Sequence, residues 1–265
     1  MDERTQRVID DARKLYEPIV IGKGSRIVRG NALWENFEKA VEACNADSMA
    51  GDSKLFENIN ELAVAKILAD DKGLKGSIEY EPSLLPSGRK IDFVADRGRD
   101  NAYIEVKSVR PNIADTEDAW KLYEKRRKLH PQQAQFIAHK DWMGGSVYGN
   151  TFSSRSKFLE YGLDFEERLA EAKNVRDGPG LLIVCGNGMS WHRSNLEDFA
   201  DYYHAGKHRQ DDPFALMEAH HIEDSKLNLL RNIDAFGSLK RHWDMAQNHE
   251  FVWPVRGPSF GGVIK

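Results

Sequence analysis

The chain of 265 residues lacks the features that mark secreted and membrane proteins. It contains only two cysteines, Cys44 and Cys185, which are too few for a disulfide framework, so we expect a reducing compartment. No stretch approaches the apolar length of a membrane span, and the charged residues 1–4 lack the apolar core of a signal peptide. We therefore expect a cytoplasmic protein with no membrane partner.

The chain also lacks internal repeats, low-complexity tracts and a strong excess of one charge. Its net charge of −4 argues against a surface that binds nucleic acid through bulk positive charge, although it permits a local basic groove. Hydrophobic residues make up 40% and charged residues 30%, as in a globular protein. The length suffices for one sizeable core with additions, or for two small domains.

The most informative stretch is residues 89–109, which predict a β-hairpin. Apolar and polar residues alternate over 91–95 and again over 103–109, and a polar turn containing Gly98 separates the two runs. A two-residue loop at positions 98–99, with glycine first, suits a hairpin. A four-residue loop closed at positions 96 and 101 gives the same register.

That register places Asp92 directly opposite Glu105. Side chains repeat every second residue along a strand, so Glu105 and Lys107 share a face. Like charges that face each other across two strands destabilise a sheet, so the two carboxylates need a cation or solvent between them. Hard divalent cations such as Mg²⁺ prefer carboxylate oxygens and keep several waters. A neighbouring lysine that orients a metal-bound water completes the equipment for phosphodiester hydrolysis.

Asp92, twelve intervening residues and then Glu105-Val106-Lys107 resemble the PD-(D/E)XK nuclease superfamily. The resemblance covers roughly residues 56–187, and Ile91 replaces the proline of the motif. It implies a three-layer α/β/α restriction-endonuclease-like core with a central mixed sheet. We expect N- and C-terminal helical additions to this core. The expected segments are an N-terminal helical segment (1–50), the nuclease-like core (51–190) and a C-terminal helical extension packed on that core (191–265).

The resemblance also implies a function and a set of site residues. Asp92 and Glu105 would bind Mg²⁺ or Mn²⁺ together with the Val106 carbonyl, and Lys107 would position the attacking water. The expected activity is that of a divalent-metal-dependent endonuclease, for which DNA is favoured over RNA as the substrate. The alternative is a catalytically inactive nucleic-acid-binding or scaffolding module of the same fold. A homodimer or a larger complex is compatible with either function.

A strongly apolar helix is predicted at residues 54–70, before the first strand of the core. Glu57 and Glu61 lie one turn apart on it. In the resembled superfamily a glutamate on this helix often completes the metal site, and Glu61 fits better because apolar residues follow it at helical offsets. Glu57 is the second candidate. For either residue alone, pairing with a surface lysine is an equally good interpretation.

Further candidates follow the hairpin. The densest basic run of the chain fits a phosphate backbone or, equally, a solvated helix face; it consists of Lys121, Lys125, Arg126, Arg127 and Lys128. The resemblance allows Gln133 or Gln132 to support the site from the next helix. Cys185 closes the apolar run 181–185, which predicts a buried central strand, so we expect a core cysteine rather than a nucleophile.

Overall fold

A computed structural model describes residues 3–44, 49–109, 154–186, 193, 196–197, 199–200, 232–241, 245–248 and 250–255. Its helices and strands follow in the order α1 (Glu3–Val20), β1 (Ile27–Val28), α2 (Gly30–Ala43), α3 (Met49–Asp70), β2 (Ile78–Tyr80), β3 (Phe93–Asp96), β4 (Asn101–Ser108), α6 (Ser154–Val175), β5 (Gly180–Gly186), β6 (Ile233–Lys240) and β7 (Glu250–Val252).

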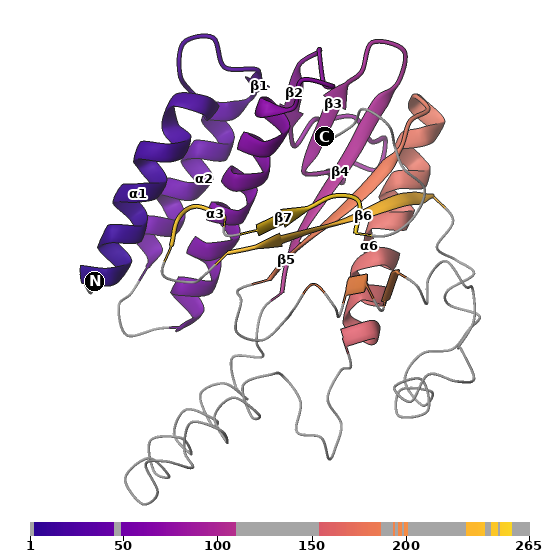
Figure 1. The fold of residues 1–265 in the computed structure, drawn as a ribbon. Helices are drawn as coiled ribbons and strands as arrows, with labels where there is room; N and C mark the ends of the chain where they lie inside the picture. Colours follow the sequence, from indigo (N-terminus) through magenta and orange to yellow (C-terminus); the bar gives the residue numbers. More distant parts are fainter. Residues whose placement is uncertain are drawn as a thin grey trace, which may run out of the picture.

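The strands form one seven-stranded mixed sheet in the order β1-β2-β3-β4-β5-β6-β7 (Figure 1). Strands β2, β3 and β4 are antiparallel neighbours, whereas β4, β5 and β6 run parallel. Strand β1 adds to one edge parallel to β2, and β7 adds to the other edge antiparallel to β6. Parallel strands need a crossover connection, and α6 lies between β4 and β5 along the chain. The predicted α/β class with a central mixed sheet is confirmed.

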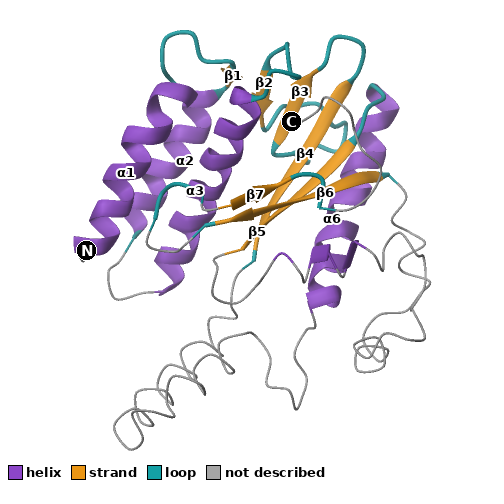
Figure 2. Ribbon diagram, viewed as in Figure 1, coloured by secondary structure: helices purple, strands orange, loops and turns teal. Residues whose placement is uncertain are grey.

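Helices cover both faces of the sheet, with α1, α2 and α3 on one side and α6 on the other (Figures 1 and 2). Alternate residues of β5 serve the two layers because side chains in a strand point to opposite faces. Leu181 and Ile183 join the apolar cluster of α1–α3, whereas Leu182 and Val184 join that of α6. The strand is buried on both faces, as predicted from its continuous apolar run.

The hairpin adopts the predicted register. Phe93 pairs with Ile104 and Asp96 with Asn101, so continuing the ladder by one residue places Asp92 opposite Glu105. The connection has four residues, 97–100, and is closed by a hydrogen bond from the Arg97 amide to the Asp100 carbonyl. Gly98 within it has a φ of 89°, a left-handed conformation that glycine adopts without strain.

Helix α3 is apolar on most sides and largely buried, as predicted, because α1 and α2 pack outside it in the same apolar cluster. The charged helical pattern of residues 3–16 predicts a helix that ends before Pro18. Helix α1 instead continues through Pro18 to Val20. Pro18 cannot donate an amide hydrogen bond and its ring crowds the carbonyl four residues earlier, but the last turn continues and buries Val20.

The expectation of a purely helical C-terminal extension is wrong for residues 233–240 and 250–252, which are strands β6 and β7. Strand β6 carries buried Ile233, Ala235, Phe236 and Leu239 among Gly237, Ser238 and charged residues. Both of its faces are buried, because Ala235 and Leu239 join the α1–α3 cluster and Ile233 and Phe236 join the α6 cluster. Tertiary contacts rather than an alternating pattern therefore determine its conformation.

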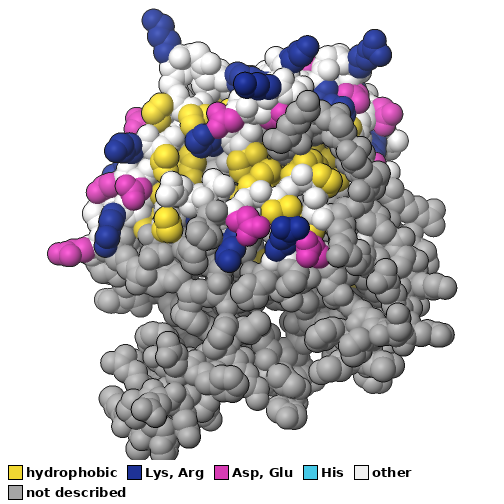
Figure 3. Space-filling model, in the orientation of Figure 1, with side chains coloured by type: hydrophobic (Ala, Val, Ile, Leu, Met, Phe, Trp, Pro, Cys, Tyr) yellow, Lys and Arg dark blue, Asp and Glu magenta, His cyan; other side chains and the backbone are white. Residues whose placement is uncertain are grey.

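The visible surface carries charges of both signs. On the face drawn in Figure 3, Lys and Arg side chains are interspersed with Asp and Glu, and hydrophobic side chains gather between them. Among the described residues, no helix is both long and apolar enough to cross a membrane.

Candidate functional site

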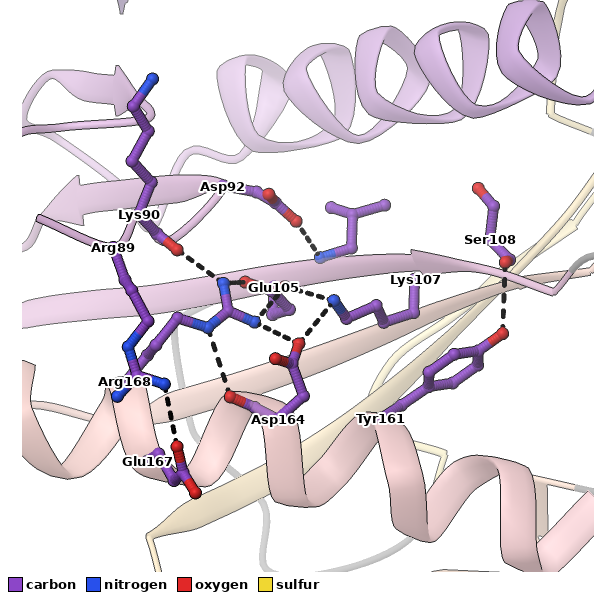
Figure 4. A network of polar contacts seen from close by, with 11 residues as sticks. Arg89, Lys90, Asp92, Glu105, Lys107, Ser108, Tyr161, Asp164, Glu167 and Arg168 are labelled. Carbon is purple, nitrogen blue, oxygen red and sulfur yellow. Dashed lines mark hydrogen bonds and ion pairs between the residues drawn. The ribbon is translucent and has the colours of Figure 1, made fainter.

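The site begins where β3 starts. The Asp92 carbonyl accepts a hydrogen bond from the Glu81 amide (2.9 Å), and β3 itself begins one residue later. The Asp92 carboxylate instead accepts the Val106 amide proton, with Oδ2 2.7 Å from the nitrogen. The side chain thus replaces a main-chain acceptor beside β4 (Figure 4). Within a strand, the amide and carbonyl of one residue point to the same neighbouring strand, so the Val106 carbonyl also faces this side.

Glu105 and Lys107 extend from β4 toward α6 (Figure 4). Lys107 Nζ lies 2.9 Å from Glu105 Oε1 and 2.8 Å from Asp164 Oδ2. Arg168, one helical turn beyond Asp164, binds both oxygens of Glu105, at 2.6 and 3.0 Å, and also contacts Asp164 Oδ2 at 2.7 Å. Glu105 is only 1% exposed, so its charge depends on these partners.

Glu61 approaches from α3, on the other side of the sheet. Its Oε2 accepts a hydrogen bond from the Tyr80 hydroxyl at 2.9 Å, and the same hydroxyl accepts one from the Asn36 amide at 3.1 Å. Burial raises the pKa of Glu61 to about 7, although the Tyr80 hydrogen bond favours the ionised form. Glu57 forms an ion pair with Lys54 at 3.4 Å, as the surface interpretation expected for it.

The electrostatics of the site connect both sides of the sheet. Burial and then repulsion by Glu105 and Glu61 raise the pKa of Asp92 well above its ordinary value. Asp92 therefore lies within electrostatic reach of both glutamates. Burial disfavours the ammonium form of Lys107, but Glu105 and Asp164 outweigh it and raise the pKa of Lys107, so this side chain is charged at neutral pH.

The charge balance indicates where a cation would be stabilised. Among the described residues, the site contains four carboxylates but only two cations. The carboxylates belong to Glu61, Asp92, Glu105 and Asp164, and the cations are Lys107 and Arg168. The two cations contact Glu105 and Asp164. Burial raises the pKa of both Asp92 and Glu61, and repulsion by Glu105 and Glu61 adds to the shift of Asp92.

The donor set fits a hard divalent cation held by a few protein oxygens. No three His, Cys, Asp or Glu side chains in the described part of the chain lie close enough together to hold a metal ion by themselves. Magnesium in enzymes is commonly bound through one or two carboxylates, with waters and substrate phosphates as the other ligands. By chemical type, the carboxylates of Asp92 and Glu105 and the Val106 carbonyl are oxygen donors of this kind, and Glu61 lies on the far side of the sheet.

Several predicted residues lie outside the described part of the chain. Gln132 and Gln133 are among them, as is the basic run Lys121, Lys125, Arg126, Arg127 and Lys128. Cys185 is described and only 1% exposed, in the α1–α3 apolar cluster. Burial raises the pKa of its thiol, so the prediction of a core cysteine is confirmed.

Two site residues, Asp164 and Arg168, were missed in the sequence. Residues 154–174 have the apolar pattern of an amphipathic helix, and Arg168 lies between Phe165 and Leu169 on its apolar side. A charged residue at a buried position needs a partner of opposite charge. This requirement is the signal that could have identified Arg168.

Comparison of the chain with models of protein families, with curated proteins and with solved structures finds no match in any of the three.

Proposed function

We propose that this protein is a divalent-metal-dependent nuclease with a restriction-endonuclease-like core. One observation carries the proposal: in the predicted register, Lys107 contacts Glu105 while the Asp92 carboxylate binds the Val106 amide between them, and Asp92 lies within electrostatic reach of Glu105, Lys107 and Glu61. The element order α3-β2-β3-β4-α6-β5, with β5 parallel to β4, supports the same fold.

Each residue has a role in this proposal. Asp92 and Glu105 would hold Mg²⁺ or Mn²⁺, with the Val106 carbonyl as a further ligand and Glu61 binding through water. A bound divalent ion supplies Lewis acidity and lowers the pKa of coordinated water. Lys107, as an ammonium group, donates hydrogen bonds to the attacking water or to the phosphoryl oxygens as negative charge develops on them.

The substrate class follows from the resemblance alone. The superfamily acts mostly on DNA, so DNA is the expected substrate rather than RNA. The described part of the chain supplies Arg89 and Lys90 in the segment that leads to Asp92. Their side chains are 47% and 46% exposed and pair with Glu167 and Glu81. A phosphate backbone would compete with those carboxylates for the two cations.

A second candidate is a binding or scaffolding module of the same fold that does not cut. The pairing of Glu105 with both Arg168 and Lys107 favours it, because this carboxylate is already neutralised within the protein.

Cleavage assays separate the two functions. The purified protein is incubated with single- and double-stranded DNA and RNA in the presence of Mg²⁺, Mn²⁺ or EDTA. Asp92→Asn keeps an acceptor for the Val106 amide and removes the charge, and Lys107→Ala removes the ammonium group. The matched control is Asp96→Asn, which alters an aspartate that is 46% exposed at the other end of β3.

The proposal expects metal-dependent cutting by the wild type and by Asp96→Asn, and its loss in the other two variants. Binding without cutting under every condition would support the scaffolding module. If cutting survives both Asp92→Asn and Lys107→Ala, neither residue belongs to the active site.

A further inference from the structure

Four side chains link β4 to α6 in a closed ring of alternating charge (Figure 4). Around the ring, the nitrogen–oxygen distances are 2.6 Å for Arg168–Glu105, 2.9 Å for Glu105–Lys107, 2.8 Å for Lys107–Asp164 and 2.7 Å for Asp164–Arg168. Two members come from the predicted site, and the other two lie one turn apart on α6.

The ring fixes Glu105 more tightly than a single ion pair would. A guanidinium that binds both oxygens of a carboxylate sets its orientation as well as its charge. Arg168 is itself held, because it also donates to the Lys90 carbonyl (2.5 Å) and, through Nε, to the Asp164 carbonyl (3.2 Å). Its side chain is 9% exposed, so little solvent competes for these bonds.

The ring also determines which carboxylate oxygen stays available. A carboxylate offers about four lone-pair sites on two oxygens. Arg168 takes one on each oxygen, and Lys107 takes a second on Oε1. Among contacts within the described part of the chain, one site on Oε2 is therefore left for a further ligand.

We propose that Arg168 and Asp164 are positioning residues of the nuclease site: Arg168 presents Oε2 of Glu105 to the divalent cation, and Asp164 holds the ammonium group of Lys107 beside it. This inference rests on the proposed function. It assigns neither residue a contact with the substrate or the ion. Asp164 is 53% exposed and touches Lys107 and Arg168 but not Glu105, so the two residues act at different points of the ring.

The test compares Arg168→Lys, Asp164→Asn and the control Lys173→Gln with the wild type. Lysine keeps the charge of Arg168 but cannot bind two oxygens in parallel. Lys173 also joins α6 to the sheet, through Asp234 at 2.9 Å, but lies outside the ring. The measurements are the Kd for Mn²⁺ alone by calorimetry, kcat and KM for cleavage, and thermal unfolding.

Removing a partner that orients a metal ligand typically costs about 10- to 100-fold in metal affinity or activity. We expect Arg168→Lys to weaken Mn²⁺ binding and to lower kcat by about that factor, with KM unchanged. Asp164→Asn should lower kcat by about 10-fold while Mn²⁺ binding stays near that of the wild type, because Asp164 does not touch Glu105. Lys173→Gln should stay within about twofold of the wild type in Kd and kcat.

The outcomes distinguish this inference from the function on which it rests. A wild-type chain that neither binds Mn²⁺ nor cuts overturns both. If the wild type binds and cuts, and both ring variants behave like Lys173→Gln, only the positioning roles are refuted. Should Arg168→Lys fail to fold, Asp164→Asn decides, because an exposed carboxylate can be neutralised without leaving a buried charge unpaired.

Discussion

Replacing Glu61 by glutamine should stabilise the metal-free protein, and increasingly so as the pH rises. The folded chain holds the proton of Glu61 up to a pH of about 7, whereas the unfolded chain releases it near its ordinary pKa of 4.5. Between these values the native state binds more protons than the unfolded state, so the wild type loses stability as the pH rises through this window. Glutamine keeps an acceptor for the Tyr80 hydroxyl and carries no charge to bury.

The size of the effect follows from the two pKa values. A native pKa of about 7 against 4.5 corresponds to a loss of about 1 kcal/mol at pH 5 and about 3 kcal/mol at pH 8. The free energy of unfolding of Glu61→Gln should exceed that of the wild type by about these amounts. A loss of 3 kcal/mol is a large part of the stability of a typical domain, so the effect is measurable.

Urea unfolding at pH 5 and pH 8, in EDTA, is the appropriate assay. Asp70→Asn is the matched control, at the end of α3, where a carboxylate 60% exposed pairs with Lys66. Its effect should stay within about 0.5 kcal/mol at both pH values. If the difference between Glu61→Gln and the wild type is the same at pH 5 and pH 8, the pKa of Glu61 is not raised in the folded protein. A gain of the same size and pH dependence in Asp70→Asn would show that the effect does not come from Glu61.

Two further predictions concern neighbouring buried groups. Tyr80→Phe removes the hydroxyl that favours the ionised form of Glu61. It should therefore destabilise the protein by about 1 kcal/mol, and more at pH 8 than at pH 5, in the same unfolding assay. In a Cys44→Ala background, the buried Cys185 thiol should react with a thiol reagent at pH 8 only as fast as the protein unfolds, because burial raises its pKa. Rapid labelling of the folded protein would contradict its place in the core.

The hairpin could be predicted because local patterns determine it. Alternating residues on both sides of a glycine turn fix the register, and a shift by one residue would turn every side chain to the opposite face. The buried strand β5 and helix α3 were predictable for the same kind of reason, since long apolar patterns identify buried elements. Predicting the opposition of Asp92 and Glu105 required nothing beyond residues 89–109.

Strand β6 was not predictable in this way. Its sequence, Ile233-Asp-Ala-Phe-Gly-Ser-Leu-Lys, contains polar residues and a glycine, and its burial does not alternate regularly. The glycine has a reason that only the fold reveals: a Cβ at Gly237 would lie 2.6 Å from the Trp253 ring, which packs against the strand. The contact partner lies 16 positions further along the chain, next to the neighbouring strand β7, so the pattern of β6 itself could not signal it.

The charge ring could not be predicted because it forms only when two residues that each need a partner of opposite charge meet in the fold. A carboxylate at Glu105 in a buried hairpin needs a cation, and an arginine on the apolar side of α6 needs an anion. Each requirement is visible in the sequence, but the two residues are 63 positions apart, and a metal ion would satisfy Glu105 equally well. Arg168 and Lys107 compensate the charge of Glu105, whereas burial raises the pKa of Asp92 and Glu61. In the proposed function, a divalent cation would therefore act mainly on the carboxylate beside β4 and on the one from α3. The pH dependence of Glu61→Gln measures what the charge of Glu61 costs the fold when no metal is present.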